Sequence, residues 1–233
     1  MATKIDARPD WRTAVNPDVL LLVVQRREGR PSLATSRRLQ LFAVACARMV
    51  WDILPTDARS AVLIRERFAD GRATEADLRA AAVRLALGAV TFRQQALNAT
   101  AADAFVAARS AAKALATRAA GPAPPGGNPV AKEWQVAWNR TFSAARDYQA
   151  ELVRDIFPPP GYAPVLHPDW RTDTVVALAR QMDDTGDFSA VPILADALQD
   201  AGCDDDNMLA RCRAASGVHC RGNWVVDLVL GRE

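Results

Sequence analysis

The chain has 233 residues, of which 50% are hydrophobic and 24% charged, and its formal net charge is +2 at pH 7. This composition can supply a full hydrophobic core and argues against a mainly disordered protein. The longest apolar runs, residues 19–24 and 41–47, are too short to cross a bilayer, and the first residues lack the apolar segment of a signal peptide. We therefore expect a soluble cytoplasmic protein with free thiols and no membrane partner.

Apolar residues recur at intervals of three and four rather than two, which is typical of helices. Caps and breakers mark the helix ends: Asn16 before Pro17, Thr56 as the cap that follows Pro55, and Thr74 as the opening of a capping box. The predicted helices of the first 157 residues cover about 17–28, 35–54, 56–70, 74–97, 100–120 and 130–157. The last of these carries on one side Trp134, Trp138, Phe142, Ala145, Tyr148, Leu152 and Ile156.

Two segments rich in glycine and proline are predicted to interrupt the helices in the rest of the chain. Residues 121–129 are rich in glycine and proline and predict a flexible connection, the most mobile internal segment. The run Pro158-Pro159-Pro160-Gly161 introduces the C-terminal part, where helices are predicted at about 172–184, 189–201 and 205–213, with a short helix or strand at 223–230. The sequence thus predicts an all-α fold, in which a multi-helix region 1–157 carries a smaller helical C-terminal lobe 158–233 packed on it.

The final segment is predicted to be structural. Trp224, Val225, Leu228 and Val229 fall at helical spacing and are expected to dock on the preceding helices, which leaves Asp227 toward water.

A pentapeptide occurs twice, letter for letter, as residues 9–13 and 168–172 (Pro-Asp-Trp-Arg-Thr). We interpret it as a device that starts a helix, with a buried tryptophan as anchor and threonine as cap. A matched pair of binding loops is the alternative.

Charge is unevenly distributed along the chain. Residues 1–54 are rich in arginine, whereas residues 172–210 hold nine aspartates against Arg180 alone. The two regions are expected to attract each other within one fold or to form solvated faces. A second interpretation is a nucleic-acid contact through the basic residues Arg26, Arg27, Arg30, Arg37 and Arg38, although interleaved aromatic residues are missing.

Three of the four cysteines and one of the two histidines lie close together near the C-terminus: Cys203, Cys212, His219 and Cys220. These side chains are of the types that bind zinc, but their spacing is irregular and His219 is adjacent to Cys220, so no cofactor is expected. A zinc-stapled or thiol-dependent enzyme remains the alternative. The neighbouring aspartates 204–206 are interpreted as helix-capping acids rather than calcium ligands.

Several strings carry a family resemblance. Residues 38–51, 66–71, 174–180, 192–203, 209–213 and 224–231 resemble a family of uncharacterised paralogous proteins abundant in planctomycete-type bacteria. The resemblance covers both ends of the chain and implies no established activity. Members often have a cysteine before the tryptophan that matches Trp224, where this chain has Asn223 and, nearby, Cys220.

Sequence alone therefore favours a non-catalytic helical interaction or adaptor module, with another protein as its partner. The alternatives are nucleic-acid association through the N-terminal arginines and a zinc or thiol enzyme. There is no phosphate-binding loop, nucleophile elbow or dinucleotide fingerprint.

Overall fold

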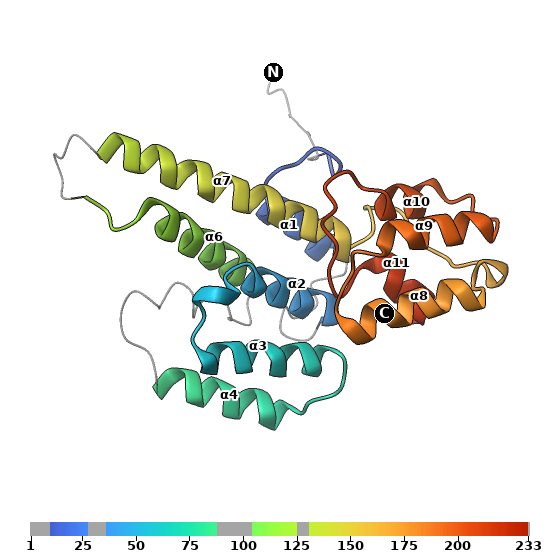
Figure 1. Ribbon diagram of the computed structural model, residues 1–233, viewed down its shortest axis with the longest axis horizontal. Coiled ribbons are helices and arrows are strands. Elements are labelled where there is room, and N and C mark those ends of the chain that lie inside the picture. Colours follow the sequence, from blue (N-terminus) through green and yellow to red (C-terminus); the bar gives the residue numbers. More distant parts are fainter. Residues whose placement is uncertain (1–9, 28–35, 88–103, 125–130, 233) are drawn as a thin grey trace, which may run out of the picture.

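The computed structural model describes residues 10–27, 36–87, 104–124 and 131–232, and these residues form an all-α fold, as predicted (Figure 1). Ten α-helices and two short 3-10 helices occur in this part of the chain, which contains no strand. No helix in the described ranges is long and apolar enough to span a membrane. The helices thus agree with the spacing of apolar residues at intervals of three and four along the sequence.

The N-terminal lobe comprises the described residues up to 157, and α2 lies at its centre. It contains α1 (Pro17–Arg27), α2 (Arg37–Arg48), α3 (Thr56–Ala69), α4 (Glu75–Leu87), α6 (Ala104–Ala120) and α7 (Ala131–Ile156). Helices α6 and α7 form one long antiparallel hairpin and α3 and α4 a second, and α2 packs on α3, α6 and α7 (Figure 1).

The C-terminal lobe comprises residues 158–232 and contains four α-helices. They are α8 (Asp173–Thr185), α9 (Val191–Asp200), α10 (Asp206–Cys212) and α11 (Trp224–Leu230). Thr172, Asp205 and Asn223 are side-chain N-caps of α8, α10 and α11, each accepting from backbone N–H groups two or three residues ahead. The segment predicted as either helix or strand is thus a helix, and the acids at 204–206 do include a capping residue.

Two predicted helix ends in the N-terminal lobe are wrong. The helix expected over 35–54 ends at Arg48 and is followed by a 3-10 turn at Trp51–Ile53, where Arg59 Nε donates to the carbonyl of Trp51 at 3.0 Å. Thr56 is the first helical residue rather than the cap, because Pro55 occupies the N-cap position. The Thr74 capping box is confirmed, since its backbone N–H donates to Asp77 Oδ2 at 2.8 Å and its hydroxyl accepts from the Asp77 N–H.

Several predictions fall on residues that the structure does not describe. The expected helix segment 88–97, the start of the next helix at 100–103 and most of the connection 121–129 lie outside the described residues, so their predictions remain open. Of that connection, residues 121–124 are non-helical, and the Gly121 carbonyl accepts from Trp134 Nε1 at 3.0 Å.

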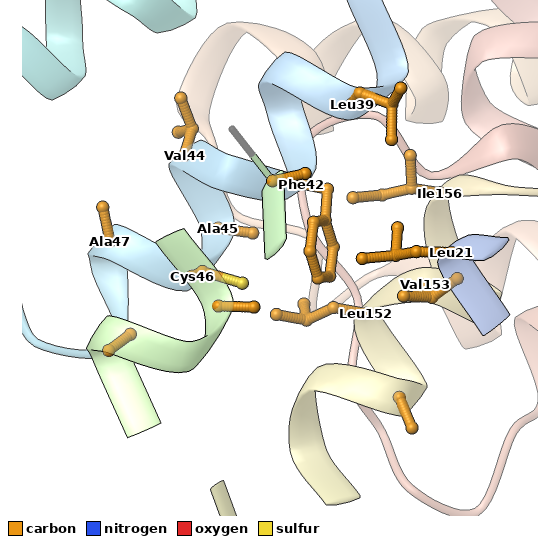
Figure 2. Packing of buried hydrophobic residues seen from close by; sticks show 14 of the residues in the cluster. Leu21, Leu39, Phe42, Val44, Ala45, Cys46, Ala47, Leu152, Val153 and Ile156 are labelled. Carbon is orange, nitrogen blue, oxygen red and sulfur yellow. The ribbon is translucent and has the colours of Figure 1, made fainter. Parts of the chain in front are cut away.

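The core of the N-terminal lobe forms where α1, α2, α6 and α7 meet. Phe42 of α2 is fully buried and lies among Leu21, Leu152 and Ile156 (Figure 2). Helix α6 buries seven alanines, which allow its backbone to approach its neighbours closely. On the side of α7 that carries the aromatic and apolar residues, Ala145, Leu152 and Ile156 are buried, whereas Tyr148 has an exposed fraction of 44%.

The C-terminal lobe has a separate core built around Trp224, which is 1% exposed. Val225 and Val229 are fully buried beside it, so docking of the final segment is confirmed, with Leu228 partly buried. The expectation for Asp227 is wrong, since this residue is buried with an exposed fraction of 2%. Asp227 lies within reach of an arginine from the other lobe, and that pairing permits its burial.

The repeated pentapeptide has different roles at its two sites. Thr172 caps α8, accepting from Val175 N–H at 3.4 Å, and Trp170 packs on the C-terminal core, as predicted. At the first site Trp11 packs on the N-terminal core, but Thr13 does not cap α1: Asn16 Oδ1 accepts from Asp18 N–H at the start of that helix. The helix-start interpretation is therefore correct for one copy and wrong for the other.

The C-terminal lobe approaches α2 closely at Gly222. Its φ is +92°, and a Cβ added there would lie 2.9 Å from Leu41 Cδ1 and 3.3 Å from Leu41 Cβ. Both the backbone conformation and the space therefore require glycine.

We predict that Gly222→Ala lowers the free energy of unfolding by about 2–5 kcal/mol, the sum of a left-handed backbone penalty and overpacking. Gly186→Ala is the matched control, because Gly186 has φ +72° and a Cβ added there would have nothing within 4 Å. The control isolates the backbone penalty of about 1–2 kcal/mol. Urea denaturation measures both variants, and equal losses would show that the approach to Leu41 has no energetic consequence.

Candidate functional site

An alternating chain of six charged side chains joins the two lobes, and we call it the junction cluster. In order of contact it consists of Asp227, Arg37, Asp70, Arg221, Asp183 and Arg232. Arg37 and Asp70 belong to the N-terminal lobe and the other four to the C-terminal lobe. None of the salt bridges in this cluster joins an arginine of residues 1–54 to an aspartate of residues 172–210: Arg37 pairs with Asp70 and Asp227, and Asp183 pairs with Arg221 and Arg232. The expected attraction between those two regions is therefore not what builds the cluster.

The contacts in the junction cluster are short, and its carboxylates are buried. Arg37 Nη1 lies 2.5 Å from Asp227 Oδ2, and its Nη2 lies 3.0 Å from Asp70 Oδ1. Arg221 Nη1 lies 3.2 Å from Asp70 Oδ2 and 2.5 Å from Asp183 Oδ1. The side chains of all three aspartates are at most 8% exposed. Burial alone would raise the pKa of Asp183, but Arg232 and Arg221 outweigh it and hold that pKa below its ordinary value.

A further buried carboxylate, that of Asp155 in α7, organises the segment that leads into α11. Its Oδ1 accepts from His219 Nδ1 at 2.8 Å and from Asn223 Nδ2 at 2.6 Å, and its Oδ2 accepts from the backbone N–H of Cys220 at 2.9 Å. Asp155 is fully buried, and Arg211 Nε lies 3.5 Å from it. One carboxylate of the N-terminal lobe therefore positions a histidine, a helix cap and a loop of the C-terminal lobe.

The hydrogen bond to Asp155 determines what His219 can do. Because a carboxylate only accepts, Nδ1 carries the proton in the neutral ring and Nε2 is left as an acceptor. Nε2 is buried and has no hydrogen-bond partner in the described part of the chain, and the side chain is 3% exposed. A buried acceptor without a donor is unfavourable unless something supplies one.

His219 lines a cavity of about 610 Å³ at the lobe junction, which we call the His219 cavity. Its apolar wall comes from the N-terminal lobe: Leu41, Val44, Ala45, Met49, Leu115 and Leu152. Its polar wall includes Arg221 and the C-terminal end of α8 from the other lobe, together with Arg48, Glu66 and Tyr148. This combination of one apolar wall and a few polar groups is typical of small-molecule sites.

The four residues considered for zinc are divided between different surroundings. Cys203 and Cys212 are buried in the C-terminal core, whereas His219 is bound to Asp155 and Cys220 packs on the N-terminal core. Within the described ranges, no group of three or more metal-binding side chains is arranged to hold an ion.

Two of the thiols are held firmly in their protonated form. Burial raises the pKa of Cys212 to about 12. Burial, and then the charge of Asp155, raises the pKa of Cys220 well above its ordinary value. Since the thiolate is the reactive form, this environment disfavours thiol chemistry at neutral pH.

The arginines considered for nucleic acid are also divided. Arg37 is used in the junction cluster, and Arg26 is exposed on α1. Arg38 is partly buried, and its Nε has no hydrogen-bond partner among the described residues. The side chain of Arg27 and all of Arg30 lie outside the described residues.

Sequence reasoning missed Asp155, Asp70, Asp183 and Arg221. For Asp155 a signal existed, because it follows Leu152 by three residues and therefore falls on the side of its helix that carries the apolar residues. For the other three no local pattern indicated burial, since their partners come from distant parts of the chain.

Comparison with protein-family models, with curated proteins and with solved structures gave no match. The resemblance of both chain ends to the planctomycete-type family stays a prediction.

We predict that Asp183→Asn lowers the free energy of unfolding by about 3 kcal/mol, since it leaves two arginines without their carboxylate. The value of about 3 kcal/mol is at the lower end of the usual cost of breaking a buried ion pair, because the Arg232 side chain is 35% exposed. Asp184→Asn is the matched control: Asp184 is the neighbouring exposed aspartate and should change stability little. Equal effects of the two substitutions in chemical denaturation would contradict a structural role for the junction cluster.

The same variant, compared with the unaltered chain, tests the pH dependence. The pKa of Asp183 is lowered on folding, so its contribution is fully present above its ordinary value of 3.8 and is lost as the pH falls through the lower folded value. The stability difference between the unaltered chain and Asp183→Asn should therefore be constant from pH 7 to about pH 5 and shrink below about pH 4. A difference that grows on acidification would contradict this.

Proposed function

We propose that the chain is a non-catalytic helical binding module that holds a small uncharged ligand in the His219 cavity. The observation that carries the proposal is the buried Nε2 of His219, a residue that lines this cavity, because Nε2 lacks a donor in the described part of the protein. Asp155 fixes the ring so that Nε2 faces away from the carboxylate as an acceptor. A ligand hydroxyl or N–H group would complete its hydrogen bonding.

The charges around the cavity favour an uncharged ligand. Arg48 Nη2 lies 2.7 Å from Glu66 Oε2, and Arg221 Nε lies 3.7 Å from Glu66 Oε1. With Asp184 also in the wall, two positive and two negative side chains surround the cavity and their charges cancel. A charged ligand would lose hydration without gaining an unpaired counter-charge.

Size and apolar lining define the rest of the ligand. A cavity of about 610 Å³ is within the usual range of roughly 300–1,000 Å³ for small-molecule sites. Leu115 and Leu152 contribute hydrocarbon surface to the wall, so we propose an apolar body with one donor group.

This site also gives the interaction module a means of regulation. Both lobes contribute to the His219 cavity, so a bound ligand would contact both and favour the geometry in which they are joined. The adaptor role toward another protein remains part of the proposal. Nucleic-acid association is less well supported, since Arg37 is paired within the fold.

The test uses 2-naphthol, which has an apolar body and one hydroxyl, and 2-methoxynaphthalene, which lacks the donor. We predict that 2-naphthol binds about tenfold more tightly, the usual value of one hydrogen bond to a buried acceptor, measured by calorimetry. Equal affinities, or no binding by either compound, would contradict the proposal.

Two variants locate the binding. His219→Asn keeps a side-chain donor for Asp155 and removes Nε2, so it should weaken 2-naphthol to the level of its methyl ether. Ala45→Leu should exclude both compounds by filling the cavity, whereas Ala144→Leu, on the exposed face of α7, should leave binding unchanged. Unchanged 2-naphthol affinity in His219→Asn would mean that the hydroxyl binds elsewhere.

A further inference from the structure

A second cavity, of about 500 Å³, is also lined by residues of both lobes. It is bounded by α1, the start of α2, the proline-rich segment after α7 and the part of α11 that carries Trp224 and Leu228. We call it the Trp224 cavity. None of its lining residues lines the His219 cavity, so the two can be tested separately.

Two residues in the wall of the Trp224 cavity carry buried donors that lack acceptors. Trp224 is 1% exposed, and its Nε1–H has no hydrogen-bond partner in the part of the chain that the structure describes. The same holds for the Nε–H of Arg38, whose nitrogen is also buried. An indole N–H and a guanidinium N–H can only donate, so a ligand that completes their hydrogen bonding must bring acceptor atoms.

The charge of the wall is positive and only partly compensated. Arg37, Arg38 and Arg232 line the cavity, and its described lining includes no aspartate or glutamate. Arg37 is paired with Asp227 and Asp70, and Arg232 with Asp183. Arg38 forms no salt bridge with a described carboxylate, although its charge also acts on Asp227. Among the described residues, Arg38 is thus the wall arginine that can still pair directly with a ligand group of single negative charge.

The remaining wall is apolar and poor in backbone donors. Val23, Val24, Phe157 and Leu228 contribute hydrocarbon surface, and three prolines have no backbone N–H to offer. A ligand here would therefore place its acceptor oxygens near Trp224 and Arg38 and an apolar body against the rest.

We infer that the Trp224 cavity binds a small organic carboxylate, whose oxygens accept from the indole N–H of Trp224 and the guanidinium of Arg38 while its hydrocarbon part packs on the apolar wall. This inference does not depend on the ligand proposed for the His219 cavity. It adds a second small-molecule site, whose wall carries unpaired hydrogen-bond donors, whereas the wall of the His219 cavity carries an unpaired acceptor.

The first experiment compares 3-phenylpropionate with 3-phenylpropanamide on the unaltered chain by calorimetry. The two have nearly the same shape, but only the acid carries the negative charge. We expect the acid to bind at least about tenfold more tightly, because a charge-assisted hydrogen bond is stronger than a neutral one. Inorganic phosphate, which lacks an apolar body, is expected to bind more weakly than the acid. Equal affinities of acid and amide, or no binding of the acid at about 1 mM, would overturn the inference.

The second experiment places the site. Arg38→Met keeps much of the length of the side chain and removes its charge and donors, and it should weaken the acid at least about tenfold. Arg26→Met, on the exposed face of α1, is the matched control and should bind as the unaltered chain does. Trp224→Phe should remove the change in tryptophan fluorescence that the acid causes. If Arg38→Met binds the acid as tightly as the unaltered chain, the acid is bound elsewhere and the inference is wrong. The comparison of acid and amide uses the unaltered chain, so it tests the inference even if a variant fails to fold.

Discussion

The arrangement of the two lobes depends on the alternating ion pairs of the junction cluster. Hydrophobic packing builds two separate cores, one around Phe42 and one around Trp224, and the hydrophobic effect that drives it is non-directional. Buried ion pairs depend strictly on position, because moving one arginine away from its carboxylate leaves a charge unpaired away from water. Their net contribution to stability is small, but they specify one relative position of the lobes.

That position determines both candidate sites. Arg221 of the junction cluster lines the His219 cavity, and Arg37 and Arg232 line the Trp224 cavity. The arginines are held by aspartates and so cannot rotate freely into the cavities or close them. The same charges therefore fix the shape of each cavity and decide the charge that a ligand has to bring.

Local features of the fold are predictable from the sequence, and long-range features are not. Thr172 and Thr74 begin helices because a cap acts on residues two or three positions away, and such a signal is complete within the sequence window. The spacing along α11 predicts that Asp227 faces water, because it lies off the apolar stripe of its own helix. Its burial depends on Arg37, 190 residues away, and no local pattern contains that partner.

The candidate site is predictable only in part for the same reason. Sequence reasoning singles out His219 and Cys220 but groups them with Cys203 and Cys212 as metal ligands. Their actual partner is Asp155, which lies 64 residues from His219 and on another lobe. Clustering in the sequence correctly singles out His219 and Cys220. Their contacts in space show hydrogen bonding to a carboxylate rather than metal binding.

Asp155 also makes the N-terminal lobe dependent on residues synthesised after it. This carboxylate lies in the last turn of α7, inside the lobe, and it accepts hydrogen bonds from His219, Cys220 and Asn223. A chain that ends before residue 219 lacks all three of these donors, so burial of the Asp155 carboxylate at the end of α7 is then unfavourable. During translation the last turn of α7 is therefore expected to reach its final packing only after these residues have been made.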